Sequence, residues 1–180
     1  GGEMQSLKGL HVVVTGGTFV DVATGLALNV NAGQELLSAL DAGVPGGVLT
    51  ANVNAWTTLA AKRALGHISE EADLQAAIRA NRRLFELYFR RPAPELPLPI
   101  LTTTSSNLTD AIPDSQSTDG ALLGLTHAGL SRLAADTSVL TGQSVGAVTL
   151  VDVINVLGLD LSDPLGQFDG HEGSTPLFLD

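Results

Sequence analysis

The spacing of apolar residues changes near residue 54, and this change limits the fold more than any other feature of the sequence. Before it, a β-branched run at Leu10–Val14 and an alternating stretch at Leu26–Val30 are separated by glycine-containing turns, which is typical of strands. After it, apolar residues recur at helical spacing, first in Trp56–Leu65. This order favours an α+β fold: N-terminal antiparallel β-strands that form a partial sandwich, followed by a bundle of about four helices.

Two regions are expected, a β-strand region at 1–53 and a helical domain at 54–180. A full sandwich usually needs about 100 residues, so the missing strands are expected upstream or in another chain. Within the helical domain, a proline-rich and then polar stretch predicts a long loop at about 92–118. The predicted tail at 160–180 is acidic, and the short segment Leu36–Leu40 fits either a strand or a helical turn.

The charge of the chain restricts its partners. Asp and Glu outnumber Lys and Arg by 19 to 9, which gives a net charge of −10 and argues against nucleic acid, whose phosphates require basic patches. No apolar run is long enough to cross a bilayer, so no membrane insertion is expected. The expected partner is a protein, or a second copy of the chain, that pairs with an open β-edge.

The string Val12–Thr18 offers the most direct route to an enzyme. It resembles the strand and turn that open bacterial asparaginases, and also the glycine-rich opening of short-chain dehydrogenases. The remaining motifs are missing: Val20 stands where the dehydrogenase pattern needs glycine, and Tyr88 has no lysine four residues later. The favoured interpretation is a hairpin turn. The alternative is an enzyme fragment, amidohydrolase or dehydrogenase-like, built on Thr15–Thr18, which requires a helix directly after Thr18.

A second catalytic possibility involves His127 and Ser131, which are four residues apart in a predicted helix with Asp136 nearby. A triad needs a nucleophile within reach of a base that a third group orients, and this spacing rarely provides that geometry. We therefore assign no catalytic residue and expect no enzyme activity.

Carboxylates in the tail suggest a possible calcium site. Ca²⁺ takes six to eight oxygen ligands, often from an acidic loop bent by glycine, and Asp163, Asp169 and Glu172 can supply some of them. Their spacing does not match an EF-hand loop. The alternatives are a calcium-stabilised adhesive module and a solvated acidic loop without any cofactor.

Several strings, in their order along the chain, carry a family resemblance: Gly16–Gly25, Leu36–Ala39, Ala51–Ala60, Gly124–Ala134 and the ending from Asp160 to Gly170. Together they resemble the helical region that follows carboxypeptidase-regulatory-like or immunoglobulin-like β-domains in bacterial secreted lipoproteins and surface proteins. The chain departs from that pattern at Asn54–Trp56, where proline is usual, which puts the start of the helix in doubt. The resemblance implies an extracellular or cell-surface location and a structural or adhesive role, and it carries over no catalytic residues.

Overall fold

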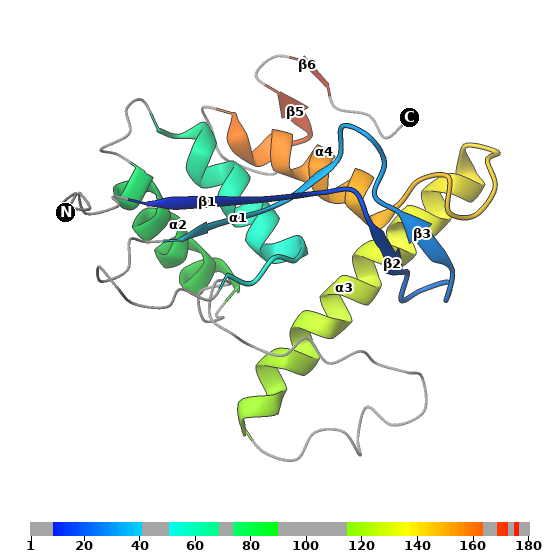
Figure 1. Cartoon of the computed structure of the whole chain (residues 1–180), viewed down its shortest axis with the longest axis horizontal. Coiled ribbons are helices and arrows are strands. Elements are labelled where there is room, and N and C mark those ends of the chain that lie inside the picture. Colours follow the sequence, from blue (N-terminus) through cyan, green and yellow to red (C-terminus); the bar gives the residue numbers. More distant parts are fainter. Residues whose placement is uncertain are drawn as a thin grey trace, which may run out of the picture. The chain divides into compact units, whose positions relative to one another are not determined.

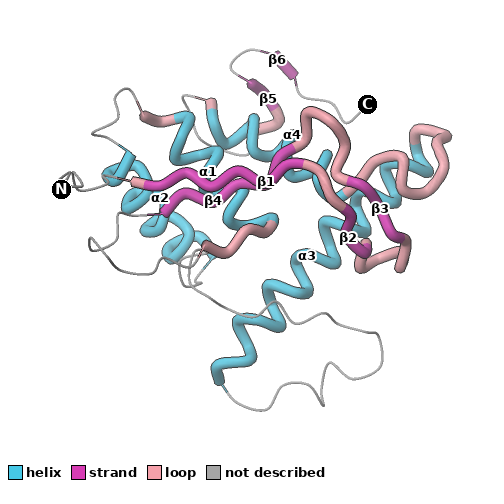
Figure 2. The backbone as a smooth tube through the Cα atoms, in the orientation of Figure 1, coloured by secondary structure: helices cyan, strands magenta, loops and turns pink. Residues whose placement is uncertain are grey.

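The computed structural model describes residues 9–40, 51–68, 74–89, 115–163, 169–172 and 175–176. Within these residues the fold is α+β, with short antiparallel strands first and four helices after them (Figures 1 and 2), which confirms the expected fold class. The strands are β1 (Leu10–Thr15), β2 (Thr18–Val20), β3 (Ala27–Asn29), β4 (Glu35–Leu40), β5 (His171–Glu172) and β6 (Thr175–Pro176). The helices are α1 (Ala55–Gly66), α2 (Leu74–Phe89), α3 (Ser115–Leu140) and α4 (Leu150–Ser162).

The first four strands form two nested pairs, β1 with β4 and β2 with β3. The inner pair is antiparallel, with Thr18 opposite Asn29. Gly16 and Gly17 have φ angles of 70° and 100°, a conformation that glycine adopts without strain, and they separate β1 from β2. The predicted turn after Asp21 is present, because the Gly25 N–H donates to the Asp21 carbonyl at 2.8 Å.

The chain divides into two compact units. One draws on Gly1–Val14, Glu35–Pro97 and Val156–Leu177, and the other on Thr15–Gln34, Leu98–Asn155 and Phe178–Asp180. Each unit takes residues from both sides of residue 53, where the sequence changes from strand to helix patterns. The segment Leu36–Leu40, for which the sequence left two options, is strand β4 and belongs to the first unit.

The core of the first unit lies between β4, α1 and α2. Its buried apolar residues are Leu37, Ala39, Ala61, Ala64 and Ile78. A helix residue ties the strand to this core: the Thr58 hydroxyl in α1 accepts the backbone N–H of Leu37 at 2.9 Å and donates to the Asn54 carbonyl at 2.7 Å. Thr58 therefore satisfies a buried strand donor from within a helix.

The start of α1 is set by Asn54. Its side chain accepts the backbone N–H groups of Trp56 and Thr57, and the Thr57 hydroxyl accepts the N–H of Asn54 at 2.8 Å. This is a reciprocal capping box, which satisfies amide groups that an uncapped helix leaves unpaired. The start of this helix, which was in doubt from the sequence, is therefore at Asn54.

Two glycines let α1 and α4 approach closely. A Cβ atom on Gly66 would lie 2.3 Å from the backbone oxygen of Ser162, and one on Gly158 would lie 2.1 Å from the Cδ atom of Lys62. The Lys62 ammonium then reaches Glu35 of β4 at 3.9 Å. Neither glycine has a positive φ angle, so the constraint is space: at Gly66 an added Cβ would meet backbone, whereas at Gly158 it would meet the flexible side chain of Lys62.

The third helix begins within the loop expected from the sequence. It covers Ser115–Leu140, so the last residues of the expected loop at 92–118 are helical and the rest of that loop lies outside the described residues. The polar run at its start lacks apolar periodicity but does not prevent a helix. Its end is fixed by Gly142, whose φ angle is 74° and whose N–H donates to the Val139 carbonyl at 3.0 Å.

Candidate functional site

The Thr15–Thr18 string, the basis of the enzyme hypothesis, lies in a strand–turn–strand. Thr15 ends β1, Thr18 begins β2, and both side chains are exposed. Residues 9–40 are all described, and none of them is helical. The helix that a phosphate-binding or asparaginase-like arrangement requires directly after Thr18 is therefore replaced by an antiparallel strand, and these residues offer no helix N-terminus to an anion.

A buried carboxylate, which the sequence analysis did not identify, organises the second unit. Asp21 is 2% exposed, and its side chain accepts both the backbone N–H of Thr24 at 2.9 Å and the Thr24 hydroxyl at 2.7 Å. Its other oxygen accepts the hydroxyl of Ser131, which in turn accepts the backbone N–H of Ala23 at 3.2 Å. The cluster joins the β2–β3 turn to α3. The polar groups of the cluster are hydrogen-bonded to one another, so the role of the cluster is to hold the turn on the helix.

The Asp21 cluster includes Ser131, the residue that the sequence suggested as the nucleophile of a possible catalytic triad. Ser131 is fully buried, with no exposed surface, and its hydroxyl is bound to Asp21. Asp136 instead contacts Arg132 at 2.9 Å on the exposed side of α3, and this carboxylate raises the pKa of the Arg132 guanidinium. Burial lowers the pKa of His127. Ser131 is thus bound to Asp21 and Asp136 to Arg132, which is not the pairing that a triad of these residues requires.

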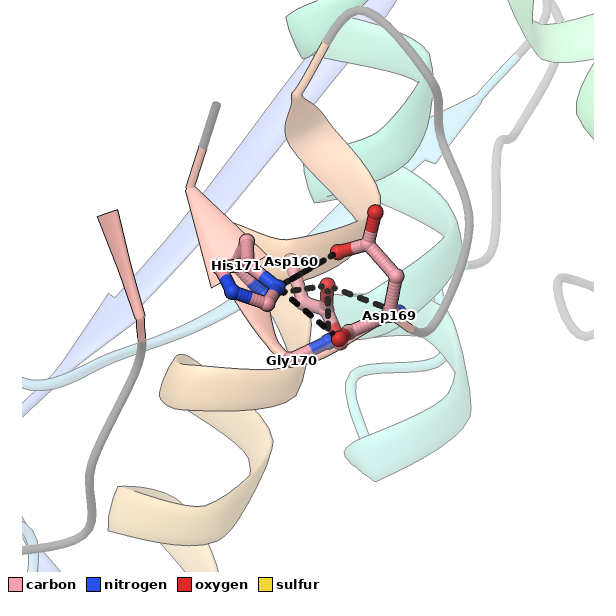
Figure 3. A network of polar contacts seen from close by, with 4 residues as sticks. All are labelled: Asp160, Asp169, Gly170 and His171. Atoms are coloured by element: carbon pink, nitrogen blue, oxygen red, sulfur yellow. Dashed lines mark hydrogen bonds and ion pairs between the residues drawn. The ribbon is translucent and has the colours of Figure 1, made fainter. Parts of the chain in front are cut away.

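A second buried carboxylate holds the tail. Asp160, near the end of α4, is 4% exposed, and it accepts three successive backbone N–H groups (Figure 3). These come from Asp169 at 3.2 Å, Gly170 at 3.1 Å and His171 at 3.3 Å. Consecutive N–H groups that converge on one anion form a nest, and the φ angle of 79° at Gly170 makes the necessary bend.

The structure does not gather the calcium candidates. Asp163 is buried at the end of α4, whereas Asp169 and Glu172 are exposed, and Asp169 accepts the His171 N–H at 3.0 Å. In the part of the chain that is described, no group of three or more His, Asp or Glu side chains is arranged to hold a metal ion. Calcium binding stays a prediction, which melting curves recorded with and without a chelator can test.

Replacing Asp160 with alanine is expected to release residues 169–172 from α4. Three backbone N–H groups then lose a charged acceptor, which costs about 2 kcal/mol locally and corresponds to roughly thirtyfold faster amide exchange at residues 169–171. Hydrogen exchange measured by NMR can detect this change. Glu172→Ala, which removes an exposed carboxylate from the same segment, is the control and should leave these rates unchanged.

Strand β1 combines exposure with an edge that no described strand occupies. β4 lies along one side of it, and the pair forms a sheet of only two strands. From Leu37 to Leu40 the residues of β4 are buried, whereas Val13 and Val14 of β1 are 46% and 41% exposed. β1 contains no charged residue and no proline, the two features that most often protect an edge against further pairing.

Comparisons with protein-family models, with curated proteins and with solved structures return no match for the chain. The resemblance to the helical region of bacterial secreted lipoproteins and surface proteins therefore stays a prediction. Among the described helices, none has both the length and the apolar character needed to cross a membrane.

Proposed function

We propose that the chain is a non-catalytic structural or interaction module that accepts a partner β-strand along the outer edge of β1. The observation that carries the proposal is this edge: it is unpaired among the described strands, uncharged, free of proline and lined by exposed valines. An extended segment that adds to such an edge gains a row of main-chain hydrogen bonds.

The distribution of polar groups supports the same function. The buried carboxylates Asp21 and Asp160 accept hydrogen bonds that join one chain segment to another. The Ser131 hydroxyl is one of the donors to Asp21. A scaffold fixed in this way suits the presentation of a rigid strand. The family resemblance adds the expectation that the module serves an exported or surface-anchored bacterial protein, where its role is structural or adhesive.

A strand-peptide titration tests this function. The probe is a fluorescently labelled peptide of alternating valine and threonine, and the control peptide has the same side chains with methylated backbone amides. We expect the first peptide to raise the anisotropy on binding and the methylated one to fail, since strand addition depends on main-chain hydrogen bonds. Equal binding of the two peptides, or binding of neither, contradicts the proposal.

A further inference from the structure

The absence of charged residues in β1 bears on which partner strand can pair with it. The segment from Gly9 to Val20 contains no Asp, Glu, Lys or Arg, although the chain as a whole carries a net charge of −10. Two copies of so acidic a chain repel each other at most contacts. A contact along β1 adds no repulsion between carboxylates of the two strands, because β1 contains no Asp or Glu.

The sequence of β1 is also self-complementary about its centre. When two copies pair antiparallel with Val13 on the two-fold axis, Val12 lies opposite Val14 and His11 lies opposite Thr15. β-branched residues opposite one another are favourable cross-strand neighbours. A two-fold interface requires this symmetry: if a residue of the first copy lies opposite a given residue of the second, the same two positions also pair with the copies exchanged.

The two faces of β1 match in this register. From Leu10 to Val13 the exposure alternates: Leu10 and Val12 are half-buried, whereas His11 and Val13 are exposed, so this part of the strand has an inner and an outer face. The alternation ends at Val14, which is 41% exposed. Because pairing about Val13 places odd residues opposite odd ones and even opposite even, the covered faces of both copies lie on one side of the joint sheet.

We propose that the strand accepted by β1 is β1 of a second copy, paired antiparallel about Val13. This inference rests on the proposed function and names its partner. Pairing stops at Thr15, because Gly16 and Gly17 with their positive φ angles turn the chain away from β1. The product is a four-stranded sheet in the order β4, β1, partner β1, partner β4.

Sedimentation velocity over a range of concentrations tests the pairing and its register. The wild-type chain should show a concentration-dependent monomer–dimer equilibrium. Val13→Lys and Val13→Glu should each abolish the dimer, because the register places two like charges opposite each other on the axis. An equimolar mixture of the two variants should restore it. Val20→Lys makes the same change at a valine that is 68% exposed on β2, and it should dimerise like the wild type.

Two results would overturn the second-copy proposal: a wild-type chain that is monomeric throughout, or a dimer that persists in both Val13 variants. The strand-peptide titration separates this failure from that of the proposed function. If the wild type is monomeric yet binds the unmethylated peptide alone, the edge function stands and its partner is another chain. If the peptide also fails to bind, both proposals are wrong. Circular dichroism of each variant verifies that it folds.

Discussion

Asp21→Ala is expected to lower the free energy of unfolding by about 3 kcal/mol. The carboxylate is 2% exposed and accepts hydrogen bonds from Thr24 and Ser131. Its removal leaves the buried Ser131 hydroxyl and the half-buried hydroxyl and N–H of Thr24 without their acceptor. A buried polar group left unsatisfied costs about 1–3 kcal/mol, and the half-buried groups add less. Urea unfolding followed by far-UV circular dichroism measures the change.

The matched control for Asp21→Ala is Asp136→Ala. Asp136 also accepts a side-chain donor, the guanidinium of Arg132 at 2.9 Å, but this pair lies on the exposed side of α3, and surface pairs contribute little to stability. We expect no measurable change for the control. Equal effects of the two substitutions would mean that the Asp21 cluster does not fasten the β2–β3 turn to α3.

Gly66→Ala is expected to destabilise the first unit by about 1–3 kcal/mol or more, because the added methyl group meets backbone instead of a side chain that can move. The new Cβ would lie 2.3 Å from the Ser162 oxygen and 2.7 Å from its Cα atom. Trp56, the one tryptophan of the chain, lies in the first turn of α1, the helix that ends at Gly66, so its fluorescence reports the unfolding of this unit.

Substitutions at two other glycines serve as comparisons for the loss of stability expected of Gly66→Ala. Gly158→Ala meets the flexible stem of Lys62, which can shift at the expense of its contact with Glu35, so a smaller loss is expected. Gly129 lies within α3 with no atom of another residue near its added Cβ, and Gly129→Ala should stabilise the helix by about 0.5–1 kcal/mol. A Gly66 variant as stable as wild type would contradict the close approach of α1 and α4.

The local elements of the fold could be predicted from the sequence. The β-branched run in β1 and the Asp–Thr–Gly turn after β2 depend on neighbouring residues, so periodicity and turn chemistry locate them. The segment Leu36–Leu40 could not be assigned, because a short apolar run fits a buried strand and a helix equally well. Its pairing with β1 resolves the ambiguity.

The long-range contacts could not be predicted. Asp21 and Ser131 are 110 residues apart, and nothing in either local pattern links them. Within the tail, the sequence drew attention to Asp163, Asp169 and Glu172. The carboxylate that organises the described part is Asp160, which was assigned to the tail from the sequence and lies in α4 in the structure. Its one local signal is the Asp169–Gly170 pair, which is typical of a turn that exposes successive N–H groups.

Amide hydrogen exchange of β1 tests the central claim, that a partner strand binds along the edge of β1 that no described strand occupies. Exchange is measured by NMR at low protein concentration, without and with an excess of the unmethylated strand peptide. We expect slower exchange at alternate residues of Leu10–Thr15, whose N–H groups point away from β4, and unchanged rates in α3. Rates in β1 that do not change, or protection that appears only in other elements, would contradict the account.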